Sequence, residues 1–184
     1  MTLEAFPADT DLPIADDRIA ALWRHWLKVR GGRAMPARQD IDPMALGPTL
    51  PHLYIYDFER GPGRFFCRLA GEEIQAGSGI RGSRRYLDEM FPPAIAAAIA
   101  LRYRRVIDGP AIVYARGLMR SAAGHIMPIE RLVLPMSADG TTANGLIGST
   151  LYRREEALNM LLDPPPLAPE RFVALPSPGW MPPR

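Results

Sequence analysis

The chain has 184 residues, of which 47% are hydrophobic and 23% are charged, values close to those of ordinary globular proteins. This length suits one domain with modest terminal extensions and leaves too little chain for a second independent core. The 22 basic and 20 acidic residues are interspersed along the chain and give a net charge of only +2. So small an excess does not indicate a nucleic-acid partner, and we expect none.

Cys67 is the only cysteine, so the chain forms no internal disulfide and offers no cysteine cluster for a structural zinc. The first residues are acidic and interrupted by Pro7, unlike the basic start and apolar core of a secretory signal. No run approaches the roughly 20 apolar residues of a membrane span. We therefore expect a cytoplasmic protein without a membrane span.

After an N-terminal extension at residues 1–15, apolar residues recur at steps of three and four and predict a helix over residues 16–31. Its apolar face carries Trp23, Trp26 and Leu27, and aromatic residues are enriched in interface cores. These three residues therefore predict the seam of a homodimer. The alternative is that the helix folds back on its own sheet.

Residues 33–50 contain several prolines and are predicted as a linker with at most one short turn. The next two runs, residues 51–58 and 64–70, are rich in aromatic and β-branched residues, and a glycine-containing turn separates them. This pattern predicts an antiparallel hairpin.

The clearest helix signal lies at residues 92–108, which begin with prolines, are rich in alanine and end at Gly109. Its inward stripe includes Ile95, Ile99 and the pair Arg102/Tyr103. Three strand-like runs follow it, at residues 111–119, 126–135 and 145–153. The tail at residues 163–184 is so rich in proline that no regular packed element is expected there.

This order of elements predicts an α+β fold over residues 16–162: a five-stranded antiparallel sheet with helices on one face, plus the N-terminal helix. The groove between sheet and helices is the expected ligand pocket, since such pockets are mostly apolar with a few placed polar groups. The polar side chains that the sequence offers to this groove are Arg68, Tyr86, Tyr103, Tyr114, Arg116, His125, Glu130 and Arg131.

Several short segments, in their order and spacing, carry a resemblance to a known family. They are Trp26, Arg30–Pro36, Asp40–Pro43, Leu50–Leu53, Phe65–Gly71, Leu87–Glu89, Tyr103–Val106 and Ile129–Pro135. Over residues 17–153 the chain resembles the single-domain bacterial PAS-like proteins. The resemblance implies a PAS fold and a role in signal sensing or partner binding rather than in chemistry.

The residues themselves indicate no chemistry either, because no nucleophile with a base and no phosphate-binding glycine loop is present. His25, His52 and His125 are too scattered for a metal site, and the helix at 92–108 has no histidine or cysteine to ligate haem. Cys67 lacks the sequence context of a flavin-adduct cysteine and is interpreted as buried and inert. We therefore predict no enzyme, no catalytic residue and no cofactor.

Glu130 and Arg131 are predicted to face opposite sides of their strand. An arginine in the pocket could pair with a carboxylate or phosphate through its planar fork. Equally, Glu130 could form a structural ion pair with Arg68 or Arg116.

The sequence thus predicts a PAS-type sensory or regulatory module of bacterial signalling that acts by ligand binding, by protein–protein contact, or by both. Because the chain carries no output domain, we expect a protein partner such as a signalling kinase. The alternative function is a small-molecule carrier for an apolar or anionic metabolite.

Overall fold

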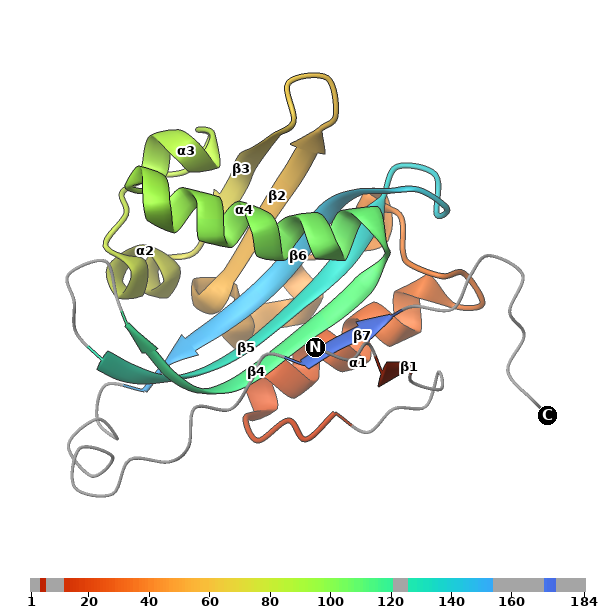
Figure 1. Cartoon of the computed structure of the whole chain (residues 1–184). Helices are drawn as coiled ribbons and strands as arrows, with labels where there is room; N and C mark the ends of the chain where they lie inside the picture. Colours follow the sequence, from red (N-terminus) through yellow and green to blue (C-terminus); the bar gives the residue numbers. More distant parts are fainter. Residues whose placement is uncertain (1–3, 6–11, 121–125, 154–170, 175–184) are drawn as a thin grey trace.

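The computed structural model describes residues 4–5, 12–120, 126–153 and 171–174, and its centre is one sheet in the order β1-β7-β4-β5-β6-β2-β3 (Figure 1). The strands are β1 (Glu4–Ala5), β2 (Leu53–Glu59), β3 (Arg64–Ala70), β4 (Ala111–Arg120), β5 (Ile126–Ser137), β6 (Ala143–Tyr152) and β7 (Arg171–Ala174). Neighbouring strands are antiparallel except for β1 and β7, which pair in parallel. The five predicted strands form the antiparallel part β4-β5-β6-β2-β3, which confirms the predicted sheet.

The proline-rich tail contributes a strand that the sequence did not predict. β7 pairs with β4 over residues 171–174, which contain no proline, so every residue there keeps the N–H that a ladder requires. The expectation of no regular element in residues 163–184 is therefore wrong at this point. The rest of the tail lies outside the described residues, as does most of the N-terminal extension.

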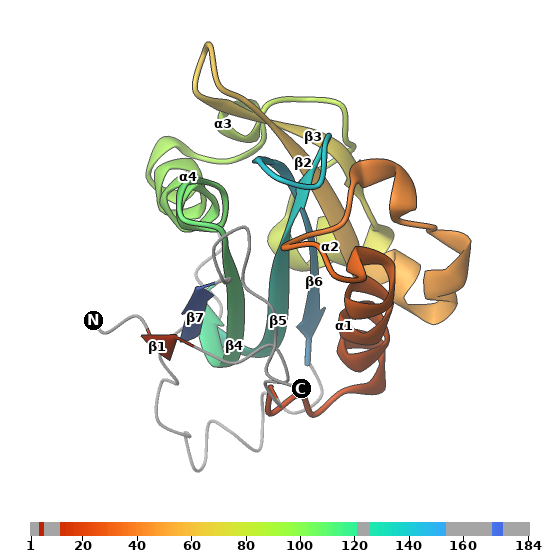
Figure 2. The same cartoon turned by 90° about the vertical axis from the view of Figure 1, so that its right-hand side faces the viewer.

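Helices cover both faces of the sheet. The helix α1 (Asp17–Arg30) packs on β5 and β6 from one side, and α4 (Pro93–Asp108) packs on β4, β5 and β6 from the other (Figure 2). The short helices α2 (Glu72–Ser78) and α3 (Leu87–Met90) lie between β3 and α4 in the chain. Because it is covered from both sides, β5 is buried along nearly its whole length, which explains why most of its residues are apolar.

The helix α1 folds back on its own sheet, as the alternative interpretation held. Asp16 caps it by accepting a hydrogen bond from the backbone N–H of Arg18 at 2.9 Å. Trp26 is 0% exposed, and its indole Nε1 donates to the carbonyl of Pro135 at 2.9 Å. Trp26 therefore has no surface to offer a dimer seam. Trp23, stacked on Trp26 with 5.7 Å between ring centroids, and Leu27 remain partly exposed.

The predicted linker is more regular than expected, because it holds the 3-10 helices η1 (Arg38–Asp40) and η2 (Met44–His52). Gly47, with a φ of +30°, breaks η2, so that Pro48 begins a new turn, where its missing N–H costs little. β2 starts at Leu53, directly after η2 and two residues later than predicted. No helix in the described part of the chain is long and apolar enough to cross a membrane.

Candidate ligand cavity

A cavity of about 330 Å³ lies between the sheet and the helices α2 and α4. Sixteen described residues line it: Tyr54, Tyr56, Ile74, Ser78, Ile80, Phe91, Ala94, Ile95, Ala98, Ile99, Arg102, Tyr103, Met119, Arg131, Thr150 and Tyr152. Most of these side chains are apolar or aromatic, and none is acidic. The cavity occupies the groove that the sequence predicted.

Tyrosine rings form much of the wall. Alternation along β2 directs Tyr54 and Tyr56 to the same face, where their ring centroids lie 6.1 and 5.3 Å from that of Tyr103. Gly148 makes room for the ring of Tyr54, because a Cβ at that position would overlap it. These rings give the cavity flat apolar surfaces.

The hydroxyl groups of these tyrosines differ in their surroundings. Burial raises the pKa of Tyr103 well above its ordinary value, and burial also raises the pKa of Tyr56, whose hydroxyl is hydrogen-bonded to the Cys67 thiol. Both phenols therefore stay neutral. The buried hydroxyl of Tyr54 has no hydrogen-bond partner within the described structure. A buried polar group of this kind is uncommon in proteins and invites an explanation.

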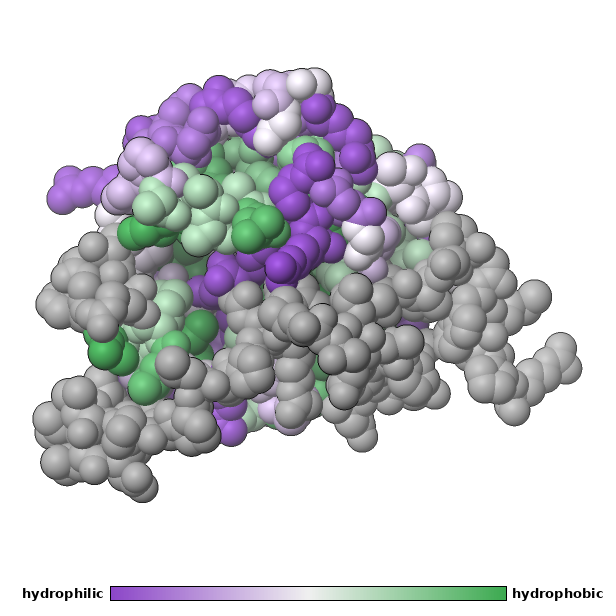
Figure 3. Space-filling view, in the orientation of Figure 1, coloured by the Kyte–Doolittle hydropathy of each residue, from purple (hydrophilic) through white to green (hydrophobic). Residues whose placement is uncertain are grey.

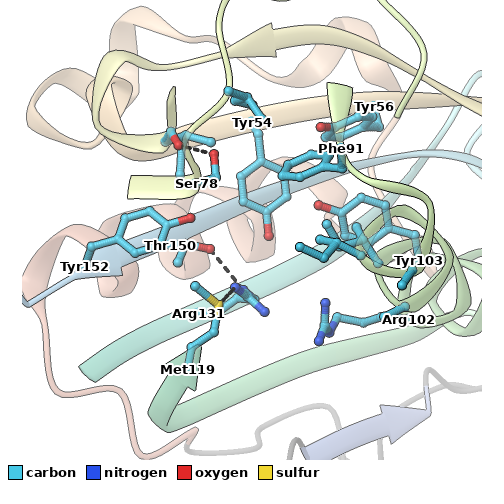
Figure 4. A pocket seen from close by; sticks show the side chains of 16 residues that line it. Tyr54, Tyr56, Ser78, Phe91, Arg102, Tyr103, Met119, Arg131, Thr150 and Tyr152 are labelled. Atoms are coloured by element: carbon cyan, nitrogen blue, oxygen red, sulfur yellow. Dashed lines mark hydrogen bonds between the residues drawn. The ribbon is translucent and has the colours of Figure 1, made fainter. Parts of the chain in front are cut away.

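Two arginines bring positive charge to the same cavity. Arg131 on β5 is only 8% exposed; its Nε donates to the Thr150 hydroxyl at 3.1 Å, and its terminal nitrogen lies 3.1 Å from the Met119 sulfur. Arg102 reaches in from α4. Figure 4 shows the Tyr54 hydroxyl directed toward the part of the cavity where both guanidinium groups lie. This arrangement suits a molecule with an apolar body and a hydrogen-bond acceptor.

Of the site residues predicted from the sequence, the structure places Tyr103 and Arg131 at the cavity. Arg68, Tyr86, Tyr114, Arg116 and Glu130 do not line it. His125 lies outside the described residues.

Arg68 lies at a bulge in the hairpin. Tyr56 pairs with Cys67 but Ile55 pairs with Leu69, so Arg68 is the extra residue of β3, and the simple alternation assumed from the sequence fails there. Its side chain is partly exposed, and its Nε lies 2.5 Å from a carboxylate oxygen of Asp57. Asp57 faces away from the cavity, because it alternates with Tyr56 along β2.

Tyr86 lies near the outer end of the same hairpin, where it precedes α3. Its hydroxyl donates to the carboxylate of Glu59 at 2.8 Å, and the guanidinium of Arg64 lies 3.7 Å from its ring centroid. This tyrosine joins the hairpin to α3 and serves the fold rather than the cavity.

Glu130 lies on the opposite face of the sheet from Arg131, as predicted. It is 0% exposed and accepts a hydrogen bond from the backbone N–H of Ala15 at 2.7 Å. Its ion-pair partner is Arg153 at 3.3 Å, rather than Arg68 or Arg116. Arg116 is exposed, although it lies directly across from Glu130 in the β4–β5 register.

Tyr114 belongs to the same anchor of α1. Its hydroxyl lies 2.6 Å from the carbonyl oxygen of Pro13 and 3.0 Å from the Glu130 carboxylate. Arg153 also lies 3.3 Å from Asp16, the residue that caps α1. We call Tyr114, Glu130 and Arg153 the α1 anchor, because together they hold the segment that begins this helix.

His52 and Cys67 have structural roles. His52 Nε2 accepts a hydrogen bond from the guanidinium of Arg18 at 3.0 Å. Burial, followed by the Arg18 charge, lowers the pKa of His52. Cys67 is fully buried, and burial raises the pKa of its thiol, as expected of an inert cysteine.

Sequence reasoning missed several residues of the cavity, of which Tyr54, Arg102, Thr150 and Tyr152 matter most. A signal for Tyr54 existed, since Tyr54, Tyr56 and Phe58 alternate along their strand. Arg102 stood on the inward stripe of its helix beside Tyr103. The positions of Thr150 and Tyr152 depend on the pairing of β6 with β2 and β5, which the sequence does not state.

Comparison with known proteins gives a family and several distant structural neighbours. A family model described as PAS domain matches residues 16–151. No curated protein matches the chain.

Among solved structures, the chain is similar to VqmA bound to DPO, at 18% identity and a TM-score of 0.45, over 64% of this chain and 59% of that one. It is also similar to a Vibrio cholerae VqmA dimer solved in the absence of target DNA, at 18% identity and a TM-score of 0.45, over 64% and 54% of the two chains. A third structure is the PAS domain of Bordetella pertussis BvgS, at 18% identity and a TM-score of 0.41, over 63% and 88%. The chain thus spans less than two thirds of either VqmA chain.

The family match extends over most of the chain, from the residue that caps α1 to the last residues of β6. This chain belongs to the PAS domain family.

Proposed function

We propose that this PAS domain is a sensory or regulatory module that binds a small molecule in the cavity beneath α4 and passes the change of occupancy to a protein partner. The observation that carries the proposal is that one cavity holds both the buried, unpartnered hydroxyl of Tyr54 and the buried guanidinium of Arg131. An unsatisfied buried hydroxyl costs about 1–3 kcal/mol, a cost that a ligand with an acceptor would remove. The cavity volume of about 330 Å³ suits a small ligand.

The two faces of β5 and β6 offer a route for the signal. Arg131 lines the cavity, whereas its neighbour Glu130 accepts a hydrogen bond from Ala15 on the other face. On β6, Tyr152 lines the cavity, and the next residue, Arg153, pairs with Glu130 and with the α1 cap. A ligand that shifts either strand would therefore shift the α1 anchor, since the residues involved are consecutive.

The surface over α1 supports the protein-partner part of the proposal. Met44, at the start of η2, is 81% exposed, and η2 packs on α1, where Trp23 is half-buried. Methionine and aromatic residues are enriched in protein–protein interfaces. In this proposal the partner is a bacterial signalling protein such as a kinase, or a second copy that contacts Trp23 and Leu27. Binding without chemistry is part of the proposal.

The same cavity supports the carrier function that the sequence left open. The sensor and the carrier differ in how α1 responds to the ligand. A sensor requires a change at the α1 anchor, whereas a carrier can bind and release its ligand without one. Hydrogen exchange of the α1 amides, measured with and without bound ligand, separates them. A change at α1 favours the sensor, and a change confined to the cavity strands and α4 favours the carrier.

A cavity-filling variant tests the binding proposal. Ile99 lines the cavity, so Ile99→Trp should fill it and abolish any thermal shift that metabolite mixtures produce in the wild-type protein. Leu101→Trp is the matched control, because Leu101 lies on the same helix but is 62% exposed and outside the cavity. The outer surface of α4 is apolar along its alanine-rich first half and hydrophilic around its arginines (Figure 3), so the control adds its ring to solvent-facing surface. Equal thermal shifts in both variants would contradict binding in this cavity.

A further inference from the structure

Resting on the proposed function, we infer that Tyr54 is the residue that discriminates between ligands, and that the ligand is a compact apolar ring compound with a hydrogen-bond acceptor, such as a carbonyl oxygen, at its edge. Gly148 is the residue that positions the Tyr54 hydroxyl. This deepens the proposed function, because it names the class of ligand, the side chain that recognises it and the residue that holds this side chain in place.

The hydroxyl of Tyr54 is the first ground for this inference. Tyr54 is only 4% exposed, its hydroxyl has no hydrogen-bond partner within the described structure, and Figure 4 shows this hydroxyl directed into the cavity. A buried polar group without a partner is uncommon, because it gives up its hydrogen bonds to water and gains none in return. A ligand in the cavity would lie next to this hydroxyl and could supply the partner.

The partner that Tyr54 lacks is a hydrogen-bond acceptor. A phenol can donate and accept, but it is the better donor, because its oxygen lone pairs are partly drawn into the ring. Among the described side chains that line the cavity, none is a carboxylate, an amide or an imidazole, and arginine side chains can only donate. The Thr150 hydroxyl accepts from Arg131 Nε, and the Tyr56 hydroxyl is bonded to Cys67. The ligand would therefore bring the acceptor with it.

Gly148 determines where the Tyr54 hydroxyl lies. The two residues stand directly opposite each other in the β2–β6 register, and a Cβ at position 148 would lie 2.3 Å from Cζ of Tyr54 and 2.5 Å from its hydroxyl oxygen. Non-bonded atoms do not approach so closely, so any larger residue would displace the ring. The absence of a side chain at Gly148 lets the ring lie over β6 and carry its hydroxyl into the cavity (Figure 4).

The remaining lining describes the body of the ligand. The rings of Tyr54, Tyr103 and Phe91, together with Ile74 and Ile80, give the cavity apolar surface. Aromatic side chains pack favourably on another ring in offset or edge-to-face arrangements. The volume of about 330 Å³ lies at the lower end of the range for ligand cavities, so it suits about one or two fused rings.

Pairs of neutral probes that differ only in the acceptor test the inference. The full chain is titrated calorimetrically with acetophenone and α-methylstyrene, and with 1-indanone and indane, so that each ketone is compared with a hydrocarbon of nearly the same shape. In Tyr54→Phe the ketones should bind about tenfold more weakly than in the wild type, because their oxygen loses its donor inside an apolar site. The hydrocarbons should bind equally well or better. Unchanged ketone affinities would overturn the inference.

Tyr56→Phe is the matched control for the loss of a hydroxyl. The Tyr56 hydroxyl is bonded to Cys67, so its removal should leave the ratio of ketone to hydrocarbon affinity as it is in the wild type. A ratio that falls equally in both variants would show that Tyr54 does not discriminate between ligands, and would overturn the inference.

Gly148→Ala tests the positioning role. The added methyl group should displace the Tyr54 ring and lower the ratio of ketone to hydrocarbon affinity about tenfold, with no further fall when it is combined with Tyr54→Phe. A general loss of stability does not change this ratio, because both ligands bind the same folded protein. Gly145→Ala is the control on the same strand, since its Cβ would lie beside Asp57, away from the cavity. An unchanged ratio in Gly148→Ala would overturn the positioning role; if this variant does not fold, Tyr54→Phe decides alone.

Failure of the inference and failure of the proposed function give different results. If Tyr54→Phe binds the ketones as the wild type does, and Ile99→Trp abolishes their binding, the cavity is a ligand site in which Tyr54 does not discriminate. If no probe binds, the molecule that copurifies with the chain decides: full occupancy in Tyr54→Phe overturns the inference alone, and reduced occupancy supports it. If no probe binds and nothing copurifies, both fail.

Discussion

The two faces of the central sheet bury their polar groups in different ways. On the α1 face, Glu130 is fully buried but is hydrogen-bonded to Ala15 and paired with Arg153. On the α4 face, Tyr54 and Arg131 are almost as buried, yet they border a cavity, and the Tyr54 hydroxyl has no partner in the described structure. The first face holds a helix in place through bonded polar groups, whereas the second leaves a buried hydroxyl beside a cavity.

Under the proposed function, one sheet supports the fold on one face and offers a ligand site on the other. Buried polar groups stabilise a protein when their partners come from the chain itself. A buried polar group without a partner in the chain costs stability, and the proposed ligand would supply that partner. Substitutions on each face test this difference. The largest losses of stability are expected on the α1 face.

Trp26→Ala should lower the free energy of unfolding by about 4 kcal/mol, since it removes a fully buried indole and leaves a cavity. Trp23→Ala, one helical turn earlier, should cost about 1 kcal/mol because the ring of Trp23 is only half-buried. Urea denaturation followed by circular dichroism measures both values. Equal losses would contradict the assignment of Trp26 to the core and of Trp23 to the surface.

Glu130→Ala should cost about 3 kcal/mol, because it removes the fully buried carboxylate that pairs with Arg153 and accepts from the N–H of Ala15. Arg116→Ala is the control: Arg116 lies opposite Glu130 in the β4–β5 register but is exposed, so its removal should change stability by less than about 0.5 kcal/mol. The same denaturation experiment applies. A large loss in the control would mean that Arg116, and not Arg153, supports the α1 anchor.

Two tyrosine-to-phenylalanine variants each remove one buried hydroxyl, one from each face of the sheet, and their effects on stability can be compared. Tyr114→Phe should cost about 1.5 kcal/mol, because the Tyr114 hydroxyl is bonded to the anchor. Tyr54→Phe, in the ligand-free protein, should cost nothing or stabilise by up to about 1 kcal/mol, since no bond is lost. If Tyr54→Phe is the more destabilising of the two, the contrast between the faces is wrong.

Smaller effects on stability are expected from the pH dependence of groups on the α1 face. The pKa of His52 is lowered in the folded protein, so its contribution to stability is present above its unfolded value of 6.5 and is lost as the pH falls below that value. His52→Gln should therefore lose less stability than the wild type between pH 7.5 and pH 5, as measured by urea denaturation at both pH values. A steeper loss in the variant would contradict this assignment.

Asp16 should also contribute stability that is lost as the pH falls, but at lower pH than His52. Hydrogen bonding to Arg18 lowers its pKa below 3.8, so the stability it adds is present above that value and is lost only in stronger acid. Asp16→Asn should thus lose stability at pH 7 while showing a weaker further loss below pH 3.8 than the wild type. Identical acid profiles for the two proteins would show that Asp16 has no such role.

Most helices and strands could be predicted from the sequence, because the spacing of apolar residues and the glycines and prolines at the ends of elements are local features. The helix at 92–108, the hairpin and the three later strands follow from such patterns. β7 did not, since a four-residue strand flanked by prolines gives almost no local signal and depends on pairing with β4. The register of the hairpin at Arg68 also depended on a bulge, which no alternation pattern reveals.

The candidate site was harder to predict than the fold, for a physical reason. Glu130 and Arg131 were correctly placed on opposite faces, because alternation decides that much. The packing of α1 and α4 against β5 decides that Arg131 points to the cavity and Glu130 points to α1. Tyr86 and Tyr114 looked equivalent to Tyr103 in the sequence, yet their hydroxyls are bonded to Glu59 and Pro13, neither of which lines the cavity.

Native mass spectrometry of the protein purified from its own host tests the central claim most directly, with wild type, Ile99→Trp and Leu101→Trp prepared in parallel. We predict that the wild type and Leu101→Trp each carry one small molecule per chain, and that Ile99→Trp, with its cavity filled, carries none. A wild-type protein that has only the mass of its own chain, or a molecule that persists in Ile99→Trp, would contradict the claim that this cavity is a ligand site.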